Sequence, residues 1–418
     1  MKKVLLISYY FPPLGMGGTQ RPAKFAKYLH EFGWHPTVLT VKPVAYFAQD
    51  ETLLDELAHV RILRTESWDP QRLLARFRCR TKAVSAQPAG SGIGTLINEK
   101  LLPFVIGPDS KRLWQAHALH AAKQLLRAEK FDVVYTTSPP HSVQLVGLKL
   151  KQIFAVKWVA DFRDAWAGGV VVHEPTAWQY QNNLRWQKKV LNAADAVLAV
   201  TPGLAEDLRA IDTDSCVHVL TNGFDPHDYP QPRRTDKRFV LCHCGSVTRF
   251  SDPDIVLQAL AALRQSDPVL AGKLLLQFVG YDALGNLQKQ VQKYGLQDMV
   301  EILGYKPHRL ALEYMVAADV LLLVALGQER DRFIPGKVFE YIGAQKPILA
   351  VCNVDDTRKL LQQNRTAIVT LPQVQIVARA VNRLLHNKAE TGKDNTDFTR
   401  QFERREQTRK LAEIMERL

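Results

Sequence analysis

The sequence has few cysteines and no long apolar run. Its 418 residues include five cysteines, scattered along the chain at Cys79, Cys216, Cys242, Cys244 and Cys352. An odd, scattered set is typical of a chain kept reduced, so it argues against a disulfide-stabilised scaffold. No apolar stretch approaches the roughly 18–20 residues needed to cross a bilayer. This excludes a protein anchored by apolar transmembrane helices.

We expect neither a targeting leader nor a metal site in this sequence. The apolar run Val4–Ile7 is short, and no small-residue cleavage site follows it, so we expect a first buried strand and a cytoplasmic protein. Cys242-His243-Cys244 lies in a strand-like apolar run without a second ligand pair at zinc spacing. No carboxylate cluster indicates another metal. We therefore expect neither a metal nor a bound cofactor.

Positive charge is in excess, with a net charge of +13 and an isoelectric point near 9.4. Anionic lipid, nucleic acid and anionic small substrates all fit such a balance. The segment from about Trp68 to Leu113 interrupts the strand pattern and is expected to be an insertion. Its basic, amphipathic part, Trp68–Lys82, predicts peripheral contact with an anionic membrane, and a solvated helix with a loop is the equal alternative. It lacks the interleaved aromatics of a nucleic-acid platform, so nucleic-acid binding is not expected.

Short apolar strands alternate with amphipathic helices in two series. The first comprises Val4–Ser8, Thr37–Val41, Asp132–Tyr135, Val156–Ala160, Ala196–Val200 and Val217–Leu220. The second comprises Phe239–Cys244, Leu274–Val279, Val300–Leu303, Val320–Val324, Pro347–Val351 and Ala367–Thr370. This alternation predicts parallel βαβ units and an α/β fold of two Rossmann-like, doubly wound domains.

A proline-rich polar stretch at 225–237 predicts the domain border. We expect an N-terminal domain over 1–230 and a C-terminal domain over 238–395. Residues 396–418 carry apolar side chains at helical spacing, from Phe402 to Leu418. They are expected to form one amphipathic helix packed on the body.

A glycine-rich turn follows the first expected strand. Gly15, Gly17 and Gly18 precede the start of a helix, where bare backbone and unpaired N–H groups attract anions. The spacing differs from the dinucleotide fingerprint, and no acidic residue suited to a ribose follows clearly. The pattern therefore disfavours a dehydrogenase.

Charged residues end another strand of the first series. Asp161, Arg163 and Asp164 fall at a carboxyl end, where ligands of open parallel sheets gather, and they could orient a hydroxyl or stabilise charge. A structural Asp–Arg pair that caps the next helix is the alternative. His141 is a second polar candidate at a strand end, or a helix-start residue.

The clearest segment runs from Phe333 to Ala350. Pro335 and Gly336 suit a first helical turn, Lys337 adds a cation, and Glu340 lies three residues further on the same face. A cation beside phosphates and a carboxylate beside ribose hydroxyls would hold a nucleoside diphosphate. A purely structural Lys–Glu pair on a surface helix is the alternative.

At these residues the chain resembles glycosyltransferase family 4, of GT-B architecture, over nearly its whole length. The similar motifs are the Pro-Pro-x-Gly-x-Gly-Gly start with Arg21, Asp-Phe-Arg-Asp-x-Trp, Thr221–Asp225, Gly245-Ser246, Phe278-Val279-Gly280, Leu303-Gly304-Tyr305 and Pro-x-Lys-x-Phe-Glu-Tyr. The resemblance implies two domains that face each other across a cleft. It also implies a nucleoside diphosphate sugar as donor and an acceptor hydroxyl, with retention of anomeric configuration and no metal.

The resemblance also assigns site residues. Glu340 would bind the donor ribose, while Lys337 and the backbone from Pro335 and Gly336 to Val338 would approach phosphates or sugar. Gly17 and Gly18 would line the pyrophosphate. Gly245, Gly280 and the loops of Tyr281 and Tyr305 would complete the donor site. Asp161 matches a catalytic or acceptor-orienting position.

Two positions depart from the family pattern. Arg332 stands where the family has the first of two glutamates, and Arg249 lacks an obvious following lysine. Arg249 and Lys337 would then stabilise leaving-group charge.

We expect a hexosyltransferase, with a lipid-linked acceptor in bacterial surface polysaccharide or glycolipid synthesis. A nucleotide-sugar epimerase of the same architecture and a non-catalytic GT-B-like scaffold remain alternatives.

Overall fold

The protein consists of two compact units. The computed structural model describes residues 1–15, 17–44, 49–69, 72, 107–168, 176–233, 236–328, 331–386 and 395–418. The N-terminal unit comprises Met1–Thr221 with Arg404–Leu418, and the C-terminal unit comprises Asn222–Glu403. The border therefore falls a few residues before the proline-rich stretch 225–237. Most of the expected basic insertion, residues 70–71 and 73–106, lies outside the described residues.

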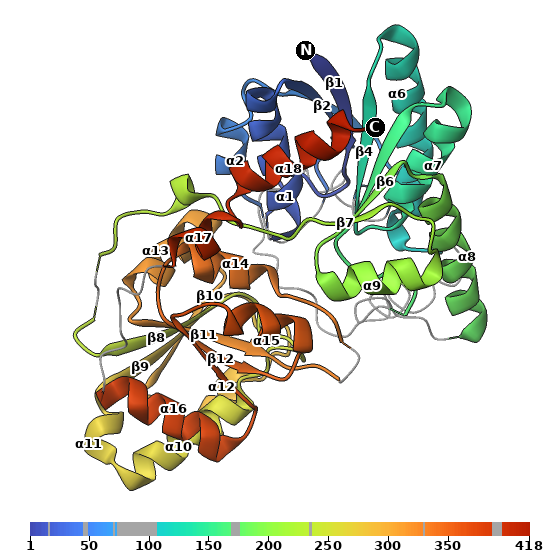
Figure 1. Ribbon diagram of the computed structural model, residues 1–418. Helices are drawn as coiled ribbons and strands as arrows, with labels where there is room; N and C mark the ends of the chain where they lie inside the picture. The colour runs from blue at the N-terminus through green and yellow to red at the C-terminus, as the bar shows by residue number, and fades with distance from the viewer. Residues whose placement is uncertain are drawn as a thin grey trace. The chain divides into compact units, whose positions relative to one another are not determined.

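The described strands of the N-terminal unit form one parallel sheet, in the order β3-β2-β1-β4-β5-β6-β7 (Figure 1). The strands are β1 (Lys2–Ile7), β2 (Trp34–Val41), β3 (Arg61–Thr65), β4 (Val133–Ser138), β5 (Lys157–Phe162), β6 (Ala196–Ala199) and β7 (Val217–Val219). The helical segments are α1 (Gly17–Tyr28), η1 (Leu29–Phe32), α2 (Thr52–Asp55), η3 (Ser110–Trp114), α6 (Gln115–Ala128), α7 (Ser142–Phe154), α8 (Ala177–Ala193), α9 (Pro202–Ile211) and α18 (Arg404–Glu416).

Alternate residues of the central strands face opposite layers of this unit. Leu5 and Ile7 of β1 belong to the core that α6, α7, α8 and α9 cover. Val4 and Leu6 belong to the core beneath α1 and α18, which receives Met415. Because both faces of the sheet are covered here, the part of β1 from Val4 to Ile7 is buried and apolar at every position, as is usual in parallel sheets.

The C-terminal unit repeats this architecture, in the strand order β10-β9-β8-β11-β12-β13. Its strands are β8 (Phe239–Cys244), β9 (Leu274–Val279), β10 (Val300–Gly304), β11 (Val320–Ala325), β12 (Ile348–Cys352) and β13 (Ala367–Thr370). Its helical segments are η4 (Pro226–Asp228), α10 (Asp254–Ser266), α11 (Pro268–Ala271), α12 (Leu287–Lys293), α13 (His308–Ala317), α14 (Gly336–Gly343), α15 (Asp355–Gln362), α16 (Val374–His386) and α17 (Thr396–Arg400).

Two layers of helices cover this second sheet as well. Leu322 of β11 faces the core beneath α10 and α16, whereas Leu321 and Leu323 face the core beneath α13 and α14. The two-domain α/β architecture expected from the alternation of strands and helices is therefore confirmed.

Two elements differ from the sequence-based expectation. The edge strand β3 was not expected, because its sequence Arg-Ile-Leu-Arg-Thr is polar at three of five positions and none of its residues is fully buried. The single C-terminal helix is instead two helices, α17 in the C-terminal unit and α18 in the N-terminal unit. Phe402 lies between them and is buried in the core of the C-terminal unit. None of the described helices has the length and apolar character needed to cross a membrane.

Candidate functional site

Each sheet has one place where the chain order reverses. In the N-terminal unit this is between β1 and β4, and in the C-terminal unit it is between β8 and β11. Ligands of doubly wound sheets bind beyond the carboxyl ends of the strands at such a switch point. The candidate residues are therefore those that follow β1 and β4 in one unit and β8 and β11 in the other.

Two glycines bring bare backbone together at the switch point of the C-terminal unit. Gly245 follows β8 with a φ of 131°, and Gly280 follows β9 with a φ of 156°, values that side chains rarely allow. A Cβ atom on Gly280 would lie 2.1 Å from the carbonyl oxygen of Gly245. Both positions therefore require glycine, and the backbone here stays accessible to a ligand.

Lys337 lies directly against this bare backbone. It occupies the first turn of α14, whose N-cap is Pro335 and whose first residue is Gly336. A Cβ atom on Gly245 would come within 2.7 Å of the Lys337 Cε and 2.9 Å of its Nζ. The helix start, the cation and the glycine backbone thus converge at one place, as in sites that bind phosphate.

The contact partner of the Lys337 ammonium is a histidine. Its Nζ lies 3.1 Å from Nε2 of His243 on β8, and Nδ1 of His243 lies 3.1 Å from the carbonyl oxygen of Leu322. Burial lowers the pKa of Lys337 to about 8, against the opposing influence of the Glu340 carboxylate. Burial, followed by the charge of Lys337, holds the pKa of His243 well below its usual value, so this ring is neutral.

Glu340, one turn further along α14, has a different partner. Its Oε1 lies 3.0 Å from Nε2 of His308, the first residue of α13, and both side chains remain about one-fifth exposed. The Tyr229 hydroxyl donates to the Glu340 carbonyl oxygen over 2.7 Å. Within the described chain, Lys337 and Glu340 thus pair with two histidines rather than with each other. The Glu340 carboxylate stays open to a ligand on one side.

The other candidates of this unit follow β8, β9 or β10, precede α14 or lie in it. Tyr281 follows β9 and is half-buried, whereas Tyr305 follows β10 and is exposed. The exposed Arg249 places its guanidinium 4.5 Å from the centre of the Phe250 ring. Arg332, at the position of the family's first glutamate, is exposed ahead of α14. The side chain of Val338 is buried, and its N–H donates to the Pro335 carbonyl, so only the backbone at the helix start faces outward.

In the N-terminal unit, Arg21 and Asp161 form a fully buried ion pair. Nη2 and Nε of Arg21 donate to the two carboxylate oxygens over 2.8 and 2.9 Å. The hydroxyls of Tyr135 and Thr137 donate to Oδ2 over 2.6 and 2.7 Å. Burial alone would raise the pKa of Asp161, but Arg21 and these hydrogen bonds hold it below its usual value. With both oxygens occupied and the side chain 0% exposed, the geometry favours a positioning role for Asp161.

Arg163 connects the glycine turn to the loop after β4. Its guanidinium donates to three carbonyl oxygens, those of Gly18, Ser138 and Pro139. The start of α1, with Gly17 and Gly18, is therefore fixed against the end of β4. The half-buried Asp164 is adjacent, and burial raises the pKa of its carboxyl group.

His141 adds a neutral imidazole at the same strand end. Its ring stacks on Trp166 with centroids 5.3 Å apart, and the described residues offer its Nδ1 no hydrogen-bond partner. Burial and the charge of Arg163 lower its pKa to about 3. At neutral pH the His141 ring is therefore an uncharged polar group at the switch point between β1 and β4.

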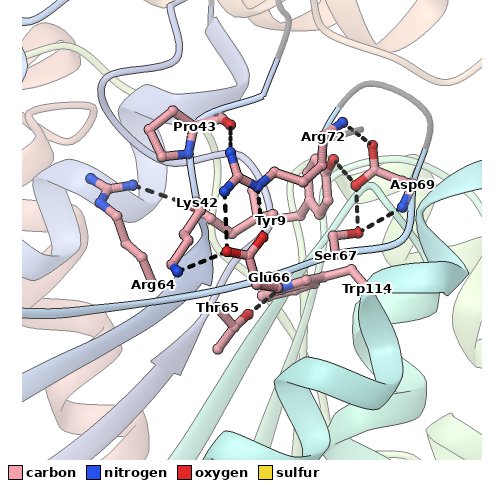
Figure 2. A network of polar contacts seen from close by, with 11 residues as sticks. Tyr9, Lys42, Pro43, Arg64, Thr65, Glu66, Ser67, Asp69, Arg72 and Trp114 are labelled. Atoms are coloured by element: carbon pink, nitrogen blue, oxygen red, sulfur yellow. Dashed lines mark hydrogen bonds and ion pairs between the residues drawn. The ribbon is translucent and has the colours of Figure 1, made fainter. Parts of the chain in front are cut away.

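A polar network fixes the ends of β1, β2 and β3 (Figure 2). The Tyr9 hydroxyl donates to Asp69 over 2.9 Å, and Lys111 lies 3.6 Å from the same carboxylate. Glu66 binds both Lys42 and Arg72, over 2.8 and 2.9 Å. The network ties the ends of these strands together through paired charges.

Sequence reasoning did not assign His243 and His308 to the site. His243 was expected to serve strand packing within Cys242–Cys244, and His308 was not singled out. The sequence offered one local signal for these residues, which was a histidine near the end of each of two strands. Their contacts with α14 span 94 and 32 residues, and so depend on the fold.

Comparison with known proteins gives matches over most of the chain. Residues 16–223 match the model of the glycosyl transferase 4-like domain, and residues 238–387 match that of glycosyl transferases group 1. The chain is 30% identical over 155 residues to D-inositol 3-phosphate glycosyltransferase 1 of Catenulispora acidiphila. That match covers 33% of this chain and spans only 37% of the length of this curated relative.

Solved structures show the same fold. Sucrose-phosphate synthase from Thermosynechococcus elongatus superposes with a TM-score of 0.67 at 18% identity, covering 100% of this chain and 99% of that one. Anabaena Alr3699/HepE, in complex with UDP and glucose, gives a TM-score of 0.67 at 18% identity and covers 100% of both chains. From its two family models and this GT-B fold, the chain belongs to the glycosyltransferases, with a 4-like N-terminal part and a group 1 C-terminal part.

Proposed function

We propose that the protein transfers a hexosyl group from a nucleoside diphosphate sugar to an acceptor hydroxyl. The bond between the anomeric carbon and the diphosphate oxygen breaks, and a bond from that carbon to the acceptor oxygen forms. The hydroxyl proton leaves to the released diphosphate or to solvent. Negative charge develops on the diphosphate, so fixed positive charge at that point lowers the barrier.

The convergence at the switch point of the C-terminal unit carries this proposal. Lys337, the start of α14 and the bare backbone of Gly245 and Gly280 together suit a diphosphate. The Glu340 carboxylate, oriented by His308, suits the two hydroxyls of a ribose. Phosphate and ribose sites one helical turn apart match the dimensions of a nucleoside diphosphate.

The remaining donor contacts extend the proposal. Arg249 supplies a second cation, and the loops of Tyr281 and Tyr305 bracket the base. Protein cations then serve the role of a metal, and none is required. The complex of Alr3699/HepE with UDP and glucose supports a nucleotide-sugar donor for this fold.

A panel of nucleotides tests the donor site. UDP, GDP, ADP, CMP and dTDP are added to wild type and to Glu340→Ala, and thermal unfolding is followed. At 100 times its dissociation constant a nucleotide stabilises by about 2.7 kcal/mol, and a tenfold loss of affinity halves this to about 1.4 kcal/mol. We expect one base to be preferred by wild type and its effect to be reduced in the variant.

Glu313→Ala is the matched control, because Glu313 is an exposed carboxylate on α13 of the same unit. Its nucleotide response should equal that of wild type. A wild type that none of the five nucleotides stabilises would contradict the donor site and favour a non-catalytic scaffold. An equal loss in both variants would contradict the assignment to Glu340.

We further propose that the transfer retains the anomeric configuration of the donor sugar. The coupling constant of the anomeric proton in the product tests this proposal.

We also propose that the acceptor is linked to a lipid and that the protein acts in bacterial surface polysaccharide or glycolipid synthesis. The basic residues of Trp68–Lys82 in the sequence support peripheral contact with anionic lipid. We expect wild type to sediment with phosphatidylserine vesicles at low salt, and a variant with Arg76, Arg78 and Arg80 changed to glutamine to sediment less. Equal sedimentation of the two proteins would contradict this contact.

A further inference from the structure

We propose that His243 is a positioning residue of the donor site, in which its neutral imidazole holds the Lys337 ammonium over the bare backbone of Gly245 for the donor diphosphate. This inference rests on the proposed function, since it concerns the same site. It assigns a role to a buried histidine on β8 whose sequence context indicated only strand packing.

The hydrogen bonds of His243 determine which atom donates and which accepts in its contact with Lys337. The carbonyl oxygen of Leu322 can only accept, so Nδ1 of His243 carries the proton and donates to it over 3.1 Å. In a neutral ring Nε2 is then an acceptor. The ammonium of Lys337, 3.1 Å away, is the donor to it. The backbone of Ser246 is a further hydrogen-bond partner of His243. Because the ring is 0% exposed, it cannot turn to other groups without losing the contact with β11.

A neutral partner preserves the charge that the diphosphate needs. A carboxylate in this position would neutralise Lys337 and compete with the phosphate oxygens, whereas an imidazole orients the ammonium and leaves its charge intact. The groups around Lys337 fit this view. Burial raises the pKa of the Cys244 thiol on β8 and of the Tyr341 hydroxyl on α14, so both are neutral. Glu340 on α14, the negative group nearby, is paired with His308.

Nucleotide affinity should therefore depend on pH in a defined direction. The anionic diphosphate binds the protonated form of Lys337, and burial lowers the pKa of that group to about 8 in the free protein. Affinity is then constant below about pH 8 and falls above it. Since a hydrogen bond to an ammonium favours its charged form, removing the acceptor moves this fall to lower pH.

The experiment measures the dissociation constant of UDP, or of whichever panel nucleotide binds best, from about pH 6.5 to about pH 9.5. His243→Met removes the imidazole acceptor and puts an apolar side chain of similar length in its place. We expect it to weaken binding about tenfold at neutral pH and to shift the decline in affinity to lower pH. His243→Gln, whose amide oxygen can accept from Lys337, should restore much of the affinity.

A double-variant cycle separates positioning from folding. If His243 acts through the cation, His243→Met should cause no further loss in a Lys337→Met background, whereas general damage to the fold would add to it. Unchanged affinity and pH profile in His243→Met, or additive losses in the cycle, would overturn the inference while leaving the donor site intact. Absence of nucleotide binding to wild type would overturn both.

Discussion

Replacing Arg21 with methionine is expected to lower the free energy of unfolding of the N-terminal unit by about 3–5 kcal/mol, the range for breaking a buried ion pair at one partner. The change leaves the Asp161 carboxylate fully buried, with the hydroxyls of Tyr135 and Thr137 as hydrogen-bond donors and the nearby charge of Arg163 as its remaining compensation. Arg21 also donates to the Thr221 carbonyl oxygen over 2.7 Å, and that acceptor loses its partner too.

Urea titration followed by tryptophan fluorescence measures this loss in the correct unit. All seven tryptophans, from Trp34 to Trp186, fall within the N-terminal unit. Glu413→Gln serves as control, because it breaks an exposed pair with Arg409 on α18 and should cost only about 0.3–0.5 kcal/mol. The double change Arg21→Met with Asp161→Leu should recover part of the loss, since no charge is left unpaired. A loss below about 1 kcal/mol for Arg21→Met would show that the buried pair contributes no more than a surface pair.

Such a pair illustrates what the sequence reveals of a site and what it does not. Asp161 is visible as a carboxylate at a strand end, where parallel sheets gather functional groups. The donors that occupy its oxygens lie 140, 26 and 24 residues away in the chain. No local pattern shows that they converge, so the sequence left a structural pair and a substrate contact as alternatives, and assigned the structural pair to the neighbouring Arg163.

The architecture was easier to predict than the site. Strands such as β11 and β12 are buried at every position and therefore appear as unbroken apolar runs between amphipathic helices. β3 carries arginines at its first and fourth positions and is only half-buried, so an edge strand of this kind gives no such run. The break between α17 and α18 was missed for a related reason. A buried residue between two helices leaves the helical spacing of apolar residues nearly unchanged.

The start of α14 was predictable because its chemistry is local. Pro335, Gly336, Lys337 and Glu340 follow one another within six residues, so helix geometry alone puts the cation and the carboxylate near one helix end. Helix geometry also favoured a mutual Lys–Glu pair. The structure instead gives each side chain an imidazole partner, and this keeps both available to a ligand.

Lys337→Met is expected to reduce kcat/KM for glycosyl transfer by about 10²–10³, the usual cost of removing one group that stabilises developing negative charge. The ammonium lies over Gly245 at the start of α14, where the proposed leaving diphosphate gains charge as the glycosidic bond breaks. The assay uses the sugar donor of whichever base stabilises wild type. Uridine, or the corresponding nucleoside, provides the internal comparison because it has no phosphate.

Phosphate-specific loss is the diagnostic result. In Lys337→Met the affinity for the nucleoside diphosphate should fall while the affinity for the nucleoside stays unchanged, whereas Glu340→Ala should weaken both, since both carry the ribose. Lys337→Arg keeps the charge but brings a wider group to a side chain that lies directly against Gly245, so partial activity is expected from it. If Lys337→Met kept kcat/KM within about threefold of wild type, less than 1 kcal/mol of barrier, the leaving-group charge would have to be stabilised elsewhere. Arg249, exposed after β8 with its guanidinium against Phe250, would then be the first residue to change.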